Sequence, residues 1–192
     1  MEVDRARQVA QALGAVRHLV VEIDLRAIGG SSLTSGDSVP KDRSEADRAS
    51  DIPSTYVPAR NTIFLSLATA YAETVGASLV YLGANVVDYS GYPDCRPEFL
   101  QAFEEVARLG TRSGVQGQGI QIRSPLLSLS KEQIIRLGMS LGVPFGLTHS
   151  CYDPDITGAA CGRCDSCRIR LDGFRAAGAT DPIMYAREHK ET

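Results

Sequence analysis

The sequence has no excess of basic charge, since its 192 residues carry 20 Lys and Arg against 23 Asp and Glu, a formal net charge of −3. Nucleic acids and anionic membranes bind proteins through a basic face, so neither is indicated as the main partner. A long hydrophobic run is also lacking, because the longest mostly apolar stretch, Thr62 to Ala72, falls far short of the roughly 20 residues that cross a bilayer. The start, MEVDRARQ, is not a secretory signal. We therefore expect a cytoplasmic protein with no direct nucleic-acid partner and no membrane partner.

A Walker A phosphate-binding loop is missing as well. Two patches rich in glycine and serine invite that reading, Gly29-Gly30-Ser31-Ser32 and Ser35-Gly36-Asp37-Ser38. The Walker A consensus G-x4-G-K-[ST] requires a lysine directly after its second glycine. No lysine follows either patch in this way, so neither patch is such a loop.

The hydrophobic pattern that is present alternates between helices and strands. A composition 43% hydrophobic and 22% charged is that of a folded chain, and the length suits one compact domain with a small appendage. The spacing of apolar residues predicts helices over 3–13, 61–75, 97–109, 130–141 and 164–176, and strands over 16–23, 79–82 and 120–122. Such alternation predicts an α/β fold with a doubly wound, mostly parallel sheet in residues 1–145. Residues 146–192 are expected to form a small C-terminal zinc-binding subdomain.

Between Arg26 and Pro58 the hydrophobic periodicity disappears into Ser, Asp, Pro and Arg. A connection this long inside a compact domain is usually functional or mobile. We interpret it as a lid-like loop.

Four of the five cysteines are close together near the C-terminus, with the spacing C-x9-C-x2-C-x2-C: Cys151, Cys161, Cys164 and Cys167. In a reducing compartment such crowding favours metal ligation over disulfides or buried free thiols. Four thiolates complete the tetrahedral shell of zinc and leave no open position, so one structural Zn²⁺ is predicted. An iron–sulfur cluster is a minor alternative, because the run lacks the C-x2-C-x2-C-x3-C-P ferredoxin pattern.

The loop 83–96 follows the carboxyl end of an expected strand, where open α/β sheets bind ligands. A carboxylate there can accept two parallel N–H bonds from a guanine-like edge, and a tyrosine can cover a ring face. A solvated turn explains the same residue types equally well. Cys95, in the same loop, is either a half-buried residue or a ligand contact. The other candidate residues of the loop are Asp88, Tyr89, Tyr92, Asp94 and Arg96.

Three further positions carry candidate polar groups. Arg60 and Asn61 begin an expected helix after Pro58, where amides and a guanidinium could meet a phosphate or carboxylate, although a plain helix start explains them nearly as well. Lys131 occupies the first turn of its helix, where a cation is disfavoured unless an anion is near, which mildly favours function. His149 precedes Cys151 and is either a group behind the metal ligands or a surface histidine.

Five features together resemble the 7-cyano-7-deazaguanine synthase family almost from end to end. They are SSLT at Ser31, YVPARN at Tyr56, DYSGYPDCR at Asp88, the helix start at Lys131 and the four-cysteine tail. They occur in the order and spacing of that family. GYPDCR together with the cysteine spacing makes a chance match a poor explanation.

The resemblance implies an enzyme that uses ATP, with Mg²⁺, and ammonia to turn 7-carboxy-7-deazaguanine into the nitrile on the route to queuosine. It implies that the four cysteines ligate zinc, and that the segments 60–61 and 88–96 line the active-site cleft. Arg60, Arg96 and Lys131 would then neutralise phosphates and a developing oxyanion, and Asp88 or Asp94 would fix the edge of the base. The oligomeric state is left open, with a homodimer among the options.

One departure concerns the family's ATP-binding loop, S-G-G-x-D-S, which lies after its first strand. The Ser35–Ser38 run lacks the second glycine and falls downstream of SSLT, so the sequence does not contain that loop. Three explanations compete: an incomplete gene product, a separate chain that supplies the missing unit, or a decayed paralogue. We favour incompleteness, since YVPARN and GYPDCR are both present, and an in-frame strand and SGGxDS upstream of Met1 would settle it.

Two other functions remain open. One is a catalytically inactive, zinc-containing module of the same family that binds the base or serves assembly. The other is a related ATP-dependent amidotransferase or thiolase that acts on another carboxylate or on tRNA, against which the charge of −3 argues weakly.

Overall fold

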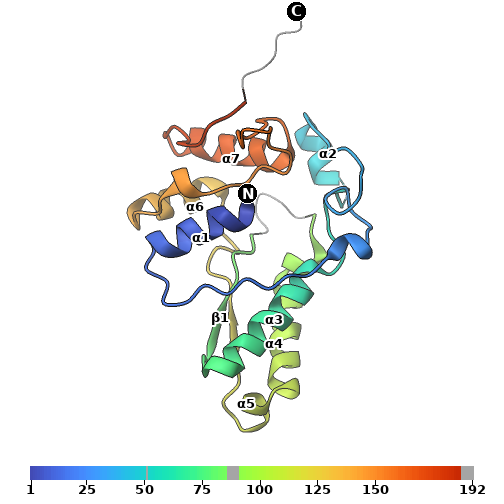
Figure 1. The fold of residues 1–192 in the computed structure, drawn as a ribbon, viewed down its shortest axis with the longest axis vertical. Coiled ribbons are helices and arrows are strands. Elements are labelled where there is room, and N and C mark those ends of the chain that lie inside the picture. The colour runs from blue at the N-terminus through green and yellow to red at the C-terminus, as the bar shows by residue number, and fades with distance from the viewer. Residues whose placement is uncertain (51, 86–90, 187–192) are drawn as a thin grey trace, which may run out of the picture. The chain divides into compact units, whose positions relative to one another are not determined.

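The computed structural model describes residues 1–50, 52–85 and 91–186 (Figure 1). Its contacts divide the chain into two compact units. The first unit comprises Met1–Asp47 and Lys131–Thr192, and the second comprises Arg48–Ser130. The first 47 residues thus group with the cysteine-rich region. The expected division between residues 145 and 146 stays a prediction.

The described residues form a mixed helix and sheet structure. The α-helices are α1 (Glu2–Ala12), α2 (Glu45–Ser50), α3 (Arg60–Val75), α4 (Pro97–Gly110), α5 (Arg112–Val115), α6 (Lys131–Ser140) and α7 (Asp165–Ala176). Single 3₁₀ turns lie at η1 (Leu25–Ala27), η2 (Pro93–Cys95) and η3 (Phe145–Leu147). The strands are β1 (Leu79–Tyr81) and β2 (Gln121–Arg123). Among these residues no helix is both long and apolar enough to cross a bilayer.

In the second unit, β1 and β2 pair in parallel, with Val80 opposite Ile122. These two side chains are buried, and they pack on one face of the sheet with residues of α3 and α4 such as Leu65 and Phe103. Figure 1 shows α3 and α4 side by side next to β1. The parallel pairing agrees with the expected α/β fold, but two strands do not show a doubly wound sheet, which stays a prediction.

Local signals set the helix ends of this unit as predicted. Gly76 follows α3 with φ of +72°, a left-handed conformation that suits glycine, and its amide donates to the carbonyls of Ala72 and Glu73. Pro97 is the first residue of α4, where its missing N–H costs nothing.

In the first unit, α6 packs against α7. A Cβ atom added to Gly173 in α7 would collide with the side chain of Lys131 and lie 2.9 Å from Cδ1 of Ile135. Glycine at this position therefore allows the two helices to approach closely. The ring of Phe145 meets that of Phe174 edge to face at 5.3 Å between centroids and closes the same small core.

The prediction of a buried strand over residues 16–23 is wrong. This segment has no regular structure, and its apolar side chains are exposed, Val16 to 98% and Leu19 to 56%. A strand satisfies its backbone by pairing with neighbours. In the described parts of the chain no strand pairs with these residues, so their apolar character alone does not form one.

Candidate metal centre and substrate-binding residues

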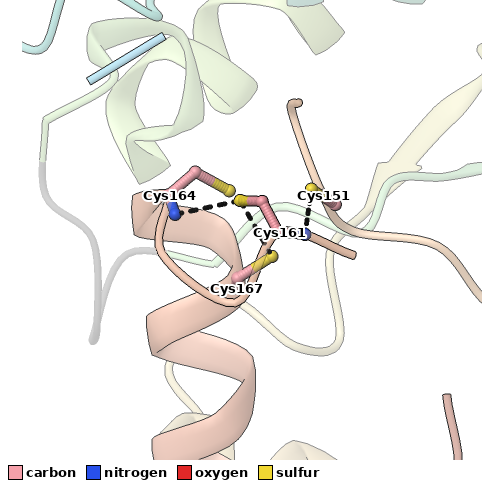
Figure 2. Close-up of side chains that lie close together, drawn as sticks. All are labelled: Cys151, Cys161, Cys164 and Cys167. Carbon is pink, nitrogen blue, oxygen red and sulfur yellow. Dashed lines mark hydrogen bonds between the residues drawn. The ribbon is translucent and has the colours of Figure 1, made fainter. Parts of the chain in front are cut away.

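The four predicted metal ligands come together in the first unit. The Sγ atoms of Cys151, Cys161, Cys164 and Cys167 all lie within 4.8 Å of one another, and three of the four residues are buried (Figure 2). Cys164 precedes α7 and Cys167 lies in its first turn, so the helix orients two of the sulfurs. Gly162 takes φ of +72° between Cys161 and Cys164, a conformation that glycine adopts without strain.

Backbone amides point at two of these sulfurs. The amides of Asp153 and Cys161 donate to Sγ of Cys151 at 3.3 and 3.2 Å, and the amides of Arg163 and Cys164 donate to Sγ of Cys161 at 3.4 and 3.3 Å. Hydrogen bonds to a sulfur favour its charged form. The turns of the chain therefore aim N–H donors at two of the four sulfurs.

The sulfurs also perturb one another. Contact with Cys164 raises the pKa of Cys151 to about 12, whereas contact with Cys151 lowers the pKa of Cys164. Contacts with Cys151 and Cys164 raise the pKa of Cys167. Four thiolates this close would repel one another. A divalent cation offsets this repulsion, and its binding releases the protons of the thiols.

The donor set fits a tetrahedral metal ion. Zinc–sulfur bonds of about 2.3 Å place tetrahedral sulfurs roughly 3.8 Å apart. Sγ of Cys161 and Sγ of Cys167 are 4.0 Å apart, so little movement is needed. These cysteines can hold a metal ion, and an all-sulfur tetrahedral shell is consistent with zinc. His149 places Nε2 2.9 Å from the carbonyl oxygen of Cys151, and so contacts the backbone of a ligand.

A buried ion pair beside the cysteines was not predicted. The guanidinium of Arg170 donates to both carboxylate oxygens of Asp181, at 2.6 and 2.9 Å, and to Oγ1 of Thr148 at 2.7 Å. The hydroxyl of Tyr185 donates to the same carboxylate at 2.7 Å. Helical periodicity could have indicated the position, because Arg170 lies three residues after Cys167 and so on the inner face of α7.

Contacts within this network shift the pKa values of Asp181 and Tyr185. Burial opposes ionisation of Asp181, but the hydrogen bonds from Arg170 and Tyr185 outweigh it and lower the pKa of this carboxyl. Burial, with the hydrogen bond to Asp181, raises the pKa of Tyr185. The network joins the chain before Cys151, the helix that carries Cys167 and the segment after α7.

In the second unit, Asn61 and Asp94 are joined by hydrogen bonds. The amide of Asn61 donates to Oδ2 of Asp94 at 2.9 Å, and its Nδ2 donates to the carbonyl oxygen of Asp94 at 3.0 Å and to Sγ of Cys95 at 3.2 Å. All three residues are buried. Cys95 is therefore packed rather than exposed, and its pKa is raised by burial and by Asp94. The carboxylate of Asp94 compensates the positive end of α3.

Arg60 and Tyr92 also lie together. The guanidinium of Arg60 stands 5.6 Å from the ring centroid of Tyr92, a cation–π contact, and the ring of Tyr56 lies 5.7 Å from that of Tyr92. Ala59, directly before α3, has φ of +54°, which is unusual for a residue with a side chain. Strained backbone of this kind concentrates at functional sites.

Of the four remaining predicted residues, the structure describes two, Arg96 and Lys131. Arg96 is exposed at the start of α4. Lys131 belongs to the first unit, where it begins α6 and its side chain packs over Gly173. Asp88 and Tyr89 lie outside the described residues. The roles expected for all of these residues stay predictions.

Comparison with known proteins gives one consistent result. The sequence profile described as "Queuosine biosynthesis protein QueC" matches residues 1–178. A protein of Anaeromyxobacter dehalogenans named 7-cyano-7-deazaguanine synthase is 59% identical, over 97% of this chain and 80% of its own length. Proteins of the same name from Kineococcus radiotolerans and Syntrophotalea carbinolica are 56% and 57% identical, over 96% and 98% of this chain and 81% of their own lengths. Together with the four clustered cysteines, these matches show that the chain belongs to the QueC family of queuosine biosynthesis proteins.

Proposed function

We propose that this protein acts as a 7-cyano-7-deazaguanine synthase and converts 7-carboxy-7-deazaguanine into the nitrile with ATP and ammonia. The observation that carries the proposal is the identity of 56% to 59% to proteins of that name over nearly the whole chain. The clustered cysteines support it, because they supply the metal centre that the resemblance implies. Its partners are then small molecules, namely the deazaguanine, ammonia and ATP with Mg²⁺.

The reaction replaces two oxygens of a carboxyl group by one nitrogen, and each of the two oxygens leaves on the phosphate of one AMP. The carboxylate first attacks ATP to give an acyl adenylate and pyrophosphate. Ammonia then displaces AMP and forms the amide. The amide oxygen then attacks the α-phosphate of a second ATP and releases pyrophosphate. AMP leaves with that oxygen while the nitrogen loses its two protons and the C–N triple bond forms. Each activation step develops negative charge that cations stabilise.

Two of the residues proposed for this chemistry already lie together. Arg60 is held over the ring of Tyr92, and so presents a fixed guanidinium at the start of α3 for a phosphate or carboxylate. Tyr92 is buried against Arg60 and Tyr56, and it is proposed as a further residue that binds the base. Arg96 and Lys131 are proposed as further cations, and Asn61, Asp88, Tyr89 and Asp94 as residues that bind or position the base.

The cysteine centre is proposed to hold one Zn²⁺ in a structural role. When bound, the ion supplies a closed tetrahedral crosslink and no open coordination position. Cys151, Cys161, Cys164 and Cys167 would hold it. The catalytic steps are therefore assigned to other residues.

The decisive experiment measures nitrile formation from 7-carboxy-7-deazaguanine with ATP and ammonia, on the printed chain and in parallel on the full reading frame of its gene. Arg60→Ala and Lys131→Ala should each lower kcat by about 100-fold, as loss of a charge-stabilising group does. Arg108→Ala is the control, because Arg108 is exposed on α4 and paired with Glu105. Unchanged turnover in Arg60→Ala, Asp94→Asn and Lys131→Ala would refute the assigned roles.

Calorimetry with the deazaguanine separates the proposed enzyme from a binding module. Binding without ATP-dependent turnover in either form of the protein would identify a base-binding module instead.

A further inference from the structure

The segment 39–43 of the long loop lies on the cysteine-rich segment 151–167, within the first unit. Lys41 and Cys164 form an antiparallel backbone bridge, and the amide of Asp42 donates to the carbonyl oxygen of Arg163 at 2.9 Å. The side chain of Val39 packs against the buried cysteines. Backbone and apolar contacts thus join the loop to the residues beside the metal ligands.

Three consecutive charged residues of the loop each find an opposite charge on the cysteine-rich segment. Nζ of Lys41 lies 2.7 Å from Oδ2 of Asp153. Nε of Arg163 donates to Oδ2 of Asp42 at 2.7 Å. The sequence Lys-Asp-Arg is therefore complementary in charge to its counterpart.

The third pair joins Arg43 to Asp165 and is the most buried of the three. Nη1 of Arg43 lies 2.8 Å from Oδ2 of Asp165, and the two side chains are only 19% and 6% exposed. Nη2 of Arg43 also donates to the carbonyl oxygen of Asp47 at 2.7 Å. Asp165 is the residue directly after Cys164, in the first turn of α7. Arg43 therefore ties the loop to a position between two metal ligands.

The backbone of the loop has an unusual conformation at Asp42, the residue that bonds to Arg163. Asp42 has φ of +55°, a left-handed conformation that costs energy for a residue with a side chain. Such a conformation persists where the surroundings impose it. Here the surroundings are the bonds of Asp42 to Arg163.

We propose that the metal centre positions segment 39–43 of the long loop, with Arg43 and Asp165 as the positioning pair, so that binding of the metal and ordering of this segment are coupled. The inference rests on the metal site of the proposed function. The five cysteines form no disulfide, and a segment of this kind depends on its metal to keep its turns. The carbonyl of Arg163 and the carboxylate of Asp165 are presented by those turns. The coupling is reciprocal, so an ordered loop also retains the metal.

Hydrogen–deuterium exchange read by mass spectrometry tests the first direction. Removal of zinc by a chelator should raise exchange in segment 39–43 by about tenfold or more, because its bonded amide and charge pairs lose their partners. The peptide containing α3 serves as the internal reference. Faster exchange at 161–167 with unchanged exchange at 39–43 would overturn the proposal.

The second direction, in which the ordered loop retains the metal, is tested on the zinc-loaded protein. Arg43→Gln should raise exchange at 39–43 and speed the transfer of zinc to a chromogenic chelator by several-fold. Arg175→Gln is the matched control, because Arg175 lies on α7, the helix of Asp165, and pairs with Asp172 at the exposed surface. Equal rates of zinc transfer in the two variants would contradict the coupling.

Two further points keep the test decisive. If Arg43→Gln does not fold, Lys41→Gln removes a more exposed pair and carries the same expectations. Neither readout depends on nitrile formation. If the protein shows the coupling but no turnover, only the proposed reaction is refuted. If it shows turnover but no coupling, only the present inference is refuted.

Discussion

Arg170 and Asp181 form a two-bonded ion pair inside the unit that carries the cysteines, with side chains only 9% and 2% exposed. The pair draws together α7, the chain before Cys151 and the segment after α7. A buried charge that loses its partner destabilises a protein strongly, even where the pair itself adds little.

Asp181→Asn should therefore lower the free energy of unfolding by about 3 kcal/mol, because the guanidinium of Arg170 stays buried without a full counter-charge. Urea unfolding followed by circular dichroism measures the change. Asp172→Asn breaks an exposed pair on α7, the helix of Arg170, and should have no measurable effect on the free energy of unfolding. Equal stability of the two variants would show that the buried pair is not important for stability.

The same carboxyl predicts a dependence on pH. Its pKa in the folded protein lies below the ordinary value of 3.8, so the stability that it adds is present above pH 3.8 and is lost as the pH falls through the lower folded pKa. The difference in unfolding free energy between the wild type and Asp181→Asn should shrink in that acid range. Taking the difference cancels acid effects common to both proteins. A constant difference down to the lowest pH would contradict the assignment.

The cysteines predict a clear contrast in metal content. Cys164→Ser should abolish stoichiometric zinc, since a tetrahedral site loses one of its four ligands. Cys95→Ser should keep the zinc, because Cys95 lies in the second unit beside Asn61. Elemental analysis of the purified proteins by mass spectrometry measures both. Loss of zinc in both variants would show that the effect is one of folding alone.

Close packing of α6 on α7 predicts the effect of a single added methyl group. Gly173→Ala should destabilise the protein by about 1–3 kcal/mol, because the new Cβ meets Lys131 and Ile135. Gly110→Ala is the control, since Gly110 is also helical but meets open space. Thermal unfolding of both variants gives the comparison. An unchanged midpoint for Gly173→Ala would mean that the helices separate at little cost.

The parts of the structure that the sequence predicts correctly depend on local signals. Gly76 and Pro97 mark helix ends through their own backbone preferences, and the cysteine spacing brings ligands together within short turns. The contact of Asn61 with Asp94 was not predicted, because it joins two motifs that are 33 positions apart.

The failures concern interactions between distant residues. The apolar run from Val16 to Ile23 reads as a strand, but a strand also needs a neighbour, and hydrophobicity does not supply one. The pairing of Arg43 with Asp165 spans 122 positions, and no local pattern identifies an arginine's partner at that range.

The alternating charges of Lys41, Asp42 and Arg43 also define which residue faces which. If the loop slipped by one position, Asp42 would oppose Asp153 and Arg43 would oppose Arg163, so that attraction became repulsion at both places. A loop attached by apolar contacts alone would tolerate such a slip. The signs of the charges in this one disfavour a slip by one position in either direction.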